Sequence, residues 1–92
     1  MPLLFEWDLE KAASNRLKHG VSFEEASTLF GDDRSLTIPD PKHSQQEPRF
    51  ITMGLSYAGR VLVVGHIDRQ GRIRLIGARP ASQKERRQHE AH

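Results

Sequence analysis

The amino-acid sequence predicts a single α+β domain, with an antiparallel sheet packed against two N-terminal helices and a short helix near the C-terminus. Three observations predict this class. A chain of 92 residues suits one domain with a small core. Helix-start signals lie in the first half of the chain, and strand-like runs joined by short turns fill the second half. The expected order is β-α-α-β-β-β-β-α, in one domain over residues 1–92.

The chain is expected to begin with a strand that leads into a helix. Apolar side chains alternate over residues 3–7, which is the period of a half-buried strand. Asp8 stands where a helix N-cap would, and the glycine that follows residue 19 suits the left-handed position after a helix. We therefore predict a helix over 9–19, with Ala13 and Leu17 on its buried side.

The stretch VSFEEA predicts the start of a second helix. Ser22 is placed as the N-cap, and Glu25, three residues later, completes a capping box. Val21 and Ala26 have the spacing of the hydrophobic staple that often accompanies this box. The helix is expected to run to about Phe30.

The rest of the chain is expected to form four strands and a last helix. A brief strand over 36–38 precedes a polar loop, PDPKHSQQEP, which contains three prolines. The turns YAG and RQG predict hairpins between three further strands, the second of which is apolar on both faces and therefore central. These strands are expected over 49–56, 60–68 and 72–79. Pro80 ends the last of them, and a capping box formed by Ser82 and Glu85 starts the C-terminal helix.

Charge is distributed unevenly along the chain. Residues 1–48 carry five Lys/Arg and nine Asp/Glu, whereas residues 49–92 carry nine Lys/Arg and three Asp/Glu. Seven of the ten arginines lie from Arg60 onward, and the guanidinium fork suits bidentate contacts to phosphate. This distribution favours a polyanion as partner. The alternative of equal weight is a solvated sheet edge that charge keeps soluble.

Several classes of function lack support in the sequence. The absence of cysteine excludes disulfide frameworks and thiolate metal sites and suits a reducing compartment. No apolar stretch approaches membrane-spanning length, and the N-terminus does not read as a signal peptide. There is no P-loop or GxGxxG stretch for a nucleotide cofactor. His43 near Asp40, and His89 near His92, lack the spacing of a known metal motif, so we expect neither a metal nor a cofactor.

Several blocks, in order and over nearly the whole chain, resemble the BrnT family of bacterial toxins. These blocks are FEWDLEKAASNRLKHGVSFEEASTLF, RFITMG, LVVGH and IRLIGARPASQKER. The resemblance implies a RelE-like α+β fold, ribonuclease activity that stops growth by blocking translation, and neutralisation by a BrnA antitoxin that carries a ribbon-helix-helix DNA-binding part. The sequence departs from the family pattern at Gly77, where a serine is usual, and at Pro80, where a lysine or a similar residue often follows AR.

The chemistry of RNA cleavage, taken with this resemblance, selects candidate site residues. Cleavage without a metal needs proton transfer and a cation that stabilises the extra negative charge on the phosphorane. Arg72 and Arg74 share one face of the last predicted strand and Arg79 lies at its far end, so we expect them to bind phosphate. His19, beside Lys18 at a helix end, is the candidate acid or base. Further RNA contacts are expected from Arg60, Arg69, Lys84, Arg86 and Arg87.

Each of these assignments has a structural alternative. Arg72 and Arg74 could line the solvent face of an edge strand. Lys18 and His19 could satisfy the last carbonyls of their helix and complement its dipole. His66, next to the run VLVVG, is a weaker candidate for proton transfer, because a histidine there is more often hydrogen-bonded within the core.

The resemblance thus implies the toxin of a type II toxin-antitoxin module, expected to be a metal-independent endoribonuclease of the cytoplasm that inhibits translation and is neutralised by a cognate antitoxin. The expected partners are RNA and a BrnA-like ribbon-helix-helix antitoxin, and the candidate partners are the ribosome and, through the antitoxin, operator DNA. We expect no membrane contact. One alternative is a non-catalytic inhibitor that binds RNA or the ribosome with the same basic face. Another is a basic surface that serves mainly to dock an acidic antitoxin segment through Arg86 and Arg87.

Overall fold

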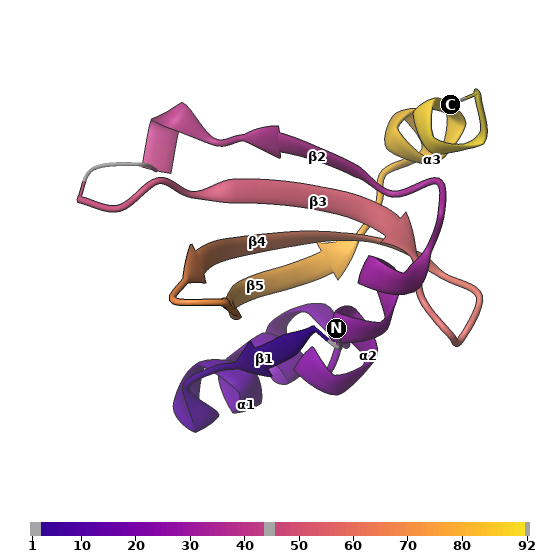
Figure 1. Ribbon diagram of the computed structural model, residues 1–92. Helices are drawn as coiled ribbons and strands as arrows, with labels where there is room; N and C mark the ends of the chain where they lie inside the picture. Colours follow the sequence, from indigo (N-terminus) through magenta and orange to yellow (C-terminus); the bar gives the residue numbers. More distant parts are fainter. Residues whose placement is uncertain (1–2, 44–45, 92) are drawn as a thin grey trace.

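A computed structural model describes residues 3–43 and 46–91 and confirms the predicted α+β class and order of elements (Figure 1). Five strands form one sheet, and along the chain the two N-terminal helices lie between the first strand and the second. No helix in this part of the chain is long and apolar enough to cross a membrane. The elements are β1 (Leu4–Glu6), α1 (Leu9–His19), α2 (Phe23–Thr28), η1 (Leu29–Gly31), β2 (Leu36–Pro39), η2 (Pro41–His43), β3 (Phe50–Leu55), β4 (Val61–Arg69), β5 (Arg72–Pro80) and α3 (Gln83–Ala91).

The strand order in the sheet is β1-β5-β4-β3-β2, so β4 is central, as the sequence predicts. Strands β2 to β5 form the expected antiparallel meander. The first strand, for which the sequence predicts no pairing, differs from the rest of the sheet, because β1 pairs with β5 in parallel. The reason is topological: β1 joins β5 only after the chain has passed through both helices and the other strands, so no hairpin fixes its direction.

Helices α1 and α2 lie along one face of the sheet, which we call the helix face (Figure 1). The main core fills the space between them. Trp7 and Phe5, at the N-terminal end of the chain, pack against this core, and Trp7 meets the Phe23 ring edge-on. The fully or almost fully buried core side chains are Val21, Phe23, Ala26, Leu29, Leu62, Val64, Leu75 and Ala78.

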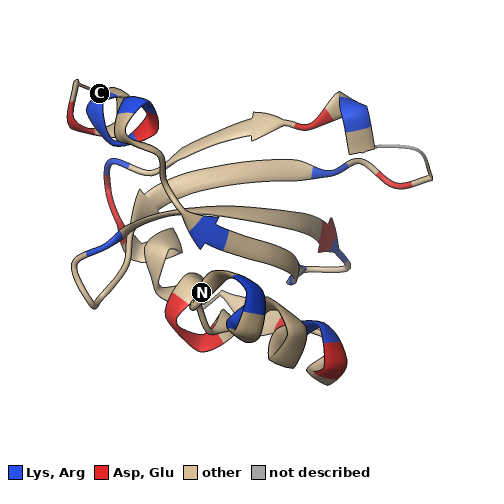
Figure 2. Cartoon of the chain, turned by 180° about the vertical axis from the view of Figure 1, so that it is seen from behind, with Lys and Arg blue, Asp and Glu red and all other residues tan. Residues whose placement is uncertain are grey.

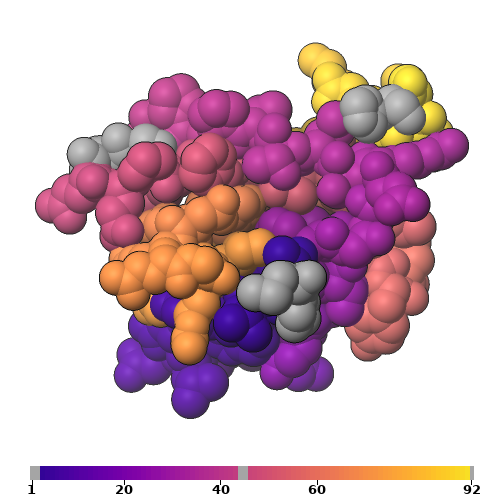
Figure 3. Space-filling model, in the orientation of Figure 1, coloured from indigo at the N-terminus to yellow at the C-terminus, as the bar shows by residue number. Residues whose placement is uncertain are grey.

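The opposite face of the sheet, which we call the open face, carries a smaller cluster made of Met53, Val63 and Ala81. Helix α3 packs at one end of this face, near β2 (Figure 1). Figure 3 shows the turn between β4 and β5, in orange, between the N-terminal segment and the segment that contains β2 and β3. On the open face, α3 covers the end near β2.

A register shift divides β5 into two halves. Gly77 lies opposite Gly65, but Leu75 lies opposite His66, so Ile76 has no partner along β4. One strand thus contributes an extra residue, which is the defining property of a β-bulge.

The shift decides which arginines share a face. In a regular strand, Arg74 and Arg79 would point to opposite faces, because they are five residues apart. With the extra residue, Arg74 pairs with Ile67 and Arg79 pairs with Val63, and both of these β4 residues lie on the open face. Arg74 and Arg79 therefore lie on the open face together.

Helix α1 has the predicted bounds, but it buries a different side. Ala13 and Leu17 are exposed, and with Leu9 they form an apolar row on the outside of the helix. The buried residue is Asn15. The prediction for Ala13 and Leu17 is wrong. The side of α1 that contacts the sheet presents the polar Asn15, so the spacing of apolar residues predicts the opposite side of the helix as the buried one.

The buried Asn15 side chain hydrogen-bonds to the backbone of Val21 and Ala78. Its Nδ2 donates to the carbonyl oxygens of Val21 at 3.0 Å and Ala78 at 2.9 Å, and its Oδ1 accepts from the Ala78 N–H at 3.1 Å. Strand β1 covers β5 only over Arg72–Arg74, so the second half of β5 has no strand beyond it. The amide of Asn15 takes the place of that strand.

Only one of the two hydrogen bonds of the predicted capping box forms at the start of α2. Ser22 Oγ accepts from the Glu25 N–H at 3.0 Å, as predicted. The Glu25 carboxylate instead binds the Arg60 guanidinium and accepts from Ser56 Oγ at 2.7 Å. The hydrogen bond from Arg60 lowers the pKa of Glu25 in spite of partial burial. Glu25 thus joins α2 to the hairpin between β3 and β4.

His66 lies in the core as part of a chain of polar side chains. Its Nε2 is 2.7 Å from Thr52 Oγ1, its Nδ1 is 3.0 Å from Asp68 Oδ1, and Thr52 Oγ1 is 2.7 Å from Thr37 Oγ1. Phenylalanine rings pack on two sides of the imidazole. Burial lowers the pKa of His66 even though Asp68 opposes the shift. His66 is thus a neutral, hydrogen-bonded core residue, and not a group placed for proton transfer in the cavity on the open face.

Helix α3 is held to the rest of the domain by a hydrogen bond near its end. His89 Nε2 lies 2.7 Å from Asp32 Oδ2, and both side chains are largely buried. Asp32 also accepts from the Leu55 N–H at 2.8 Å and the Arg34 N–H at 3.0 Å. Burial acts to raise the pKa of Asp32, but these hydrogen bonds and His89 together lower it. The pair fixes the orientation of α3 beside the open face.

We expect Asn15→Ala to lower the free energy of unfolding by about 3 kcal/mol, because it leaves the N–H and C=O of Ala78 and the C=O of Val21 buried without partners. Denaturant unfolding followed by circular dichroism measures this change. The control is Ser14→Ala on the exposed side of the same helix, for which we expect a change within about 0.5 kcal/mol. Equal effects of the two substitutions would contradict the role of Asn15.

The lowered pKa of His66 predicts a loss of stability in mild acid. Below the ordinary value of 6.5, the unfolded chain takes up a proton at this position that the folded chain resists, so the free energy of unfolding falls as the pH falls. His66→Gln removes this term while it keeps a group able to bind Thr52. We expect the variant to lose less stability than the wild type between about pH 7 and pH 5, in urea titrations at each pH. Parallel curves for the two proteins would refute this account.

Candidate active site

The open face contains a cavity of about 390 Å³ at the register shift. Its floor is formed by β3, β4 and β5, where Gly65 and Gly77 are cross-strand partners without side chains. One wall comes from α1 and the other from the loop between β2 and β3. The polar and charged side chains that line it are Asn15, His19, Asp40, His43, Arg49 and Arg79.

His19 reaches the cavity because α1 ends directly after it. Gly20 follows with a left-handed φ of 68° and donates its N–H to the Arg16 carbonyl at 2.9 Å, which stops the helix. Among the described residues, the side chains of Lys18 and His19 donate to no helical carbonyl. Lys18 lines a shallower hollow of about 270 Å³ that His19 shares. Thus Lys18 lies next to the cavity, and His19 is part of its wall.

Arg79 enters the cavity from the end of β5 and is held by α3. Its two terminal nitrogens donate to the Glu85 carboxylate at 2.8 and 2.9 Å, and Nη1 also donates to the Pro80 carbonyl at 3.3 Å. Glu85 accepts in turn from the Ser82 N–H, and Ser82 Oγ accepts from the Glu85 N–H, so the predicted capping box is confirmed. The hydrogen bond from Arg79 lowers the pKa of Glu85 to about 2. None of these contacts with described residues uses Nε, so that side of the guanidinium can bind an anion.

Arg72 and Arg74 lie on the same face at the other end of β5. Glu6 on β1 is 3.0 Å from Arg74 Nη1 and 4.0 Å from Arg72 Nη1. Neither arginine lines the cavity. The structure therefore brings Arg79 and His19 together and places Arg72 and Arg74 farther along the open face.

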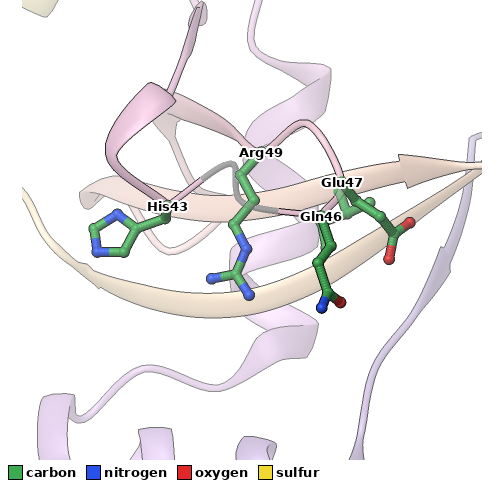
Figure 4. Close-up of a pocket in the computed structure, with 5 residues that line it drawn as sticks. His43, Gln46, Glu47 and Arg49 are labelled. Atoms are coloured by element: carbon green, nitrogen blue, oxygen red, sulfur yellow. The ribbon is translucent and has the colours of Figure 1, made fainter.

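Arg49 directly precedes β3 and lies between the loop and the open face. It lines both the cavity and a neighbouring hollow of about 270 Å³, which it shares with His43, Gln46 and Glu47. Figure 4 shows the side chains of His43, Arg49 and Gln46 extending to the same side of the loop. The pKa of Glu47 is lowered, mainly by a hydrogen bond from Arg69 and also by the charges of Arg49 and Arg74.

The remaining predicted RNA contacts lie outside the cavity. Arg60 binds Glu25 and the Gly20 carbonyl, and Arg69 binds Glu47. Arg86 shares a hollow of about 470 Å³ with Arg60, between α3 and the hairpin that joins β3 to β4. Figure 2 shows Lys and Arg on α3, at the end of β5 and on α1, with Asp and Glu among them. Lys84 and Arg87 are exposed on α3.

Sequence reasoning missed part of the wall of the cavity. Arg49 and Asn15 carry no local signal, because their importance comes from contacts with distant parts of the chain. From the sequence, Asp40 and His43 are candidates only as metal ligands. Over residues 3–43 and 46–91, no group of three or more His, Cys, Asp or Glu side chains is placed to hold a metal ion.

The position where the sequence has Gly77 could accept a larger residue. A Cβ placed on Gly77 would lie 3.9 Å from Asn15 Oδ1, which is an ordinary van der Waals distance. The serine that the family resemblance leads one to expect there would therefore fit on the floor of the cavity without disturbing the bond between Asn15 and Ala78.

Comparison with known proteins identifies relatives of the chain. The crystal structure of the Brucella abortus ribonuclease toxin BrnT has the same fold, with a TM-score of 0.69 and 20% sequence identity, over 89% of this chain and 100% of that one. A search of curated proteins found no match. The family model described as the ribonuclease toxin BrnT of type II toxin-antitoxin systems matches residues 7–85. The chain therefore belongs to the BrnT family, the ribonuclease toxins of type II toxin-antitoxin systems.

Proposed function

We propose that this toxin is a metal-independent endoribonuclease whose active site is the cavity on the open face. The observation that supports this most directly is that one imidazole from α1 and guanidiniums from β3 and β5 line a single cavity: His19, Arg49 and Arg79. Proton transfer and stabilisation of a phosphorane need these groups and no metal.

The arginines of the open face have separate roles in this proposal. Arg79, fixed by Glu85, and Arg49 hold the phosphate that reacts and offset the charge that develops on it. His19 transfers a proton, and Lys18 adds positive charge beside it. Arg72 and Arg74 bind the RNA backbone farther along the face. Weaker backbone contacts come from Arg60, Arg69, Lys84, Arg86 and Arg87.

The toxin is proposed to act in the cytoplasm, where RNA cleavage inhibits translation. Its antitoxin is proposed to be a BrnA-like protein with a ribbon-helix-helix part, which would also connect the toxin to operator DNA. Blocking the open face is the most direct means of inhibition. The ribosome is a further candidate partner, because its RNA offers the phosphates that basic side chains bind.

The experiment that tests this function is incubation of the purified toxin with total RNA and with translating ribosomes, in chelator, with and without excess antitoxin. Cleavage that persists in chelator and disappears with antitoxin is the expected result. RNA that stays intact in both settings but binds the toxin with steep salt dependence would favour the non-catalytic alternative. Cleavage that chelator abolishes would contradict metal independence.

We expect Arg79→Ala to reduce the rate of RNA cleavage by about 100-fold or more, because it removes a cation positioned at the developing negative charge. Arg74→Ala should cost less, about 10-fold, because Arg74 lies outside the cavity. The matched control is Arg16→Ala on the exposed part of α1, for which we expect the wild-type rate. Initial rates on one RNA measure all three, with circular dichroism to confirm folding. A wild-type rate for Arg79→Ala would remove this residue from the site.

A further inference from the structure

The wall of the cavity opposite α1 contains a paired carboxylate and imidazole. His43 Nδ1 lies 2.8 Å from Asp40 Oδ2, and the two side chains are 62% and 17% exposed, respectively. We propose that His43, oriented by Asp40, is the general base that removes the proton from the attacking 2′-hydroxyl, and that His19 is the general acid. This assignment rests on the proposed metal-independent cleavage of RNA in the cavity.

The fold fixes this pair at the edge of the sheet. The Asp40 N–H donates to the Arg49 carbonyl at 2.8 Å, which ties the loop to the start of β3. The turn η2 follows at once, and the His43 N–H donates to the Asp40 carbonyl at 3.3 Å. The backbone of the pair is therefore attached to the same strand that supplies Arg49 to the cavity.

Asp40 also determines which nitrogen of His43 can react. A carboxylate accepts from an N–H, so in the neutral ring the proton resides on Nδ1 and the lone pair on Nε2. Nε2 makes no hydrogen bond to any described residue. When Nε2 takes up a proton, the carboxylate stabilises the imidazolium that forms. This is the property that a general base requires.

The position of His19 suits the opposite role. His19 is the last residue of α1 and lines the cavity from the side opposite His43. The two histidines come from opposite walls, because α1 lies beside β5 whereas η2 lies beside β2 and β3. The low floor at Gly65 and Gly77 leaves space for a phosphate between them. The other charged groups on this cavity are Arg49 and Arg79, with Glu47 near His43.

The proposed step balances within the RNA and the two histidines. The 2′-hydroxyl proton passes to Nε2 of His43 as the 2′-oxygen forms a bond to phosphorus. The bond from phosphorus to the 5′-oxygen breaks, and that oxygen takes a proton from the imidazolium of His19. The products are a 2′,3′-cyclic phosphate and a free 5′-hydroxyl, and the two histidines have exchanged protonation states. Acid and base on opposite sides of the phosphate suit an in-line displacement.

A substrate with a sulfur in place of the bridging 5′-oxygen separates the two roles, because a thiolate leaves without protonation. The substrate is an RNA oligonucleotide that contains a cleavage site mapped in total RNA, prepared with either oxygen or sulfur at that position and assayed in chelator. We expect His43→Ala to lose about 100-fold or more in kcat on both substrates. His19→Ala should lose as much on the oxygen substrate but less than about 10-fold on the sulfur substrate.

Two further variants test the part played by Asp40. Asp40→Asn should lower kcat by about 10-fold or more with little change in KM, because Asn no longer stabilises the imidazolium. Added imidazole should restore part of the activity of His43→Ala. Lys42→Ala, an exposed neighbour in the same turn, is the matched control and should cleave at the wild-type rate. Circular dichroism shows whether each variant is folded.

The outcomes separate this assignment from the proposed function. An active wild type with an equally active His43→Ala variant would overturn the role of His43 alone. A loss for His43→Ala that disappears on the sulfur substrate would make His43 the acid and overturn its role as base. A wild type that leaves RNA intact in chelator would overturn both proposals.

Discussion

The three hydrogen bonds of the Asn15 side chain are the constraint on which the rest of the structure depends. Strand β1 ends at Glu6, so the second half of β5 would otherwise bury backbone groups without partners. The amide satisfies both groups of Ala78 and at the same time holds the Val21 carbonyl, just beyond the end of α1. One side chain thus fixes the helix end that carries His19 against the strand that carries Arg79. The geometry of the cavity follows from this attachment.

The two faces of the sheet have different physical roles. The helix face buries the large apolar side chains and the neutral His66, and it supplies most of the hydrophobic stabilisation. The open face has only a small apolar cluster, and its central part is occupied by glycine rather than by large side chains. The register shift in β5 allows this division, because it directs Leu75 and Ala78 to the core while Arg74 and Arg79 both remain on the open face.

Carboxylates hold most of the arginines on or near the open face. Glu85 binds Arg79 in a bidentate manner, Glu6 lies beside Arg72 and Arg74, and Glu47 binds Arg69. Such pairs contribute little to stability where they are exposed, but they restrict the guanidiniums to defined orientations. The Arg79 guanidinium is therefore already oriented by its bidentate pair with Glu85.

Local signals in the sequence determined the elements of the fold. Asp8 and Gly20 predict the two ends of α1, and Ser22 and Ser82 predict the starts of the other two helices. The short turns predict the hairpins. Each of these features depends only on neighbours in the chain. The tertiary structure alone decided that Asn15 is buried, that β1 runs parallel to β5, and that β5 contains an extra residue. The tertiary structure also decided that His19 of α1 and His43 of the loop after β2 line one cavity. These features depend on contacts between residues that are far apart in the sequence, and no local pattern encodes such contacts.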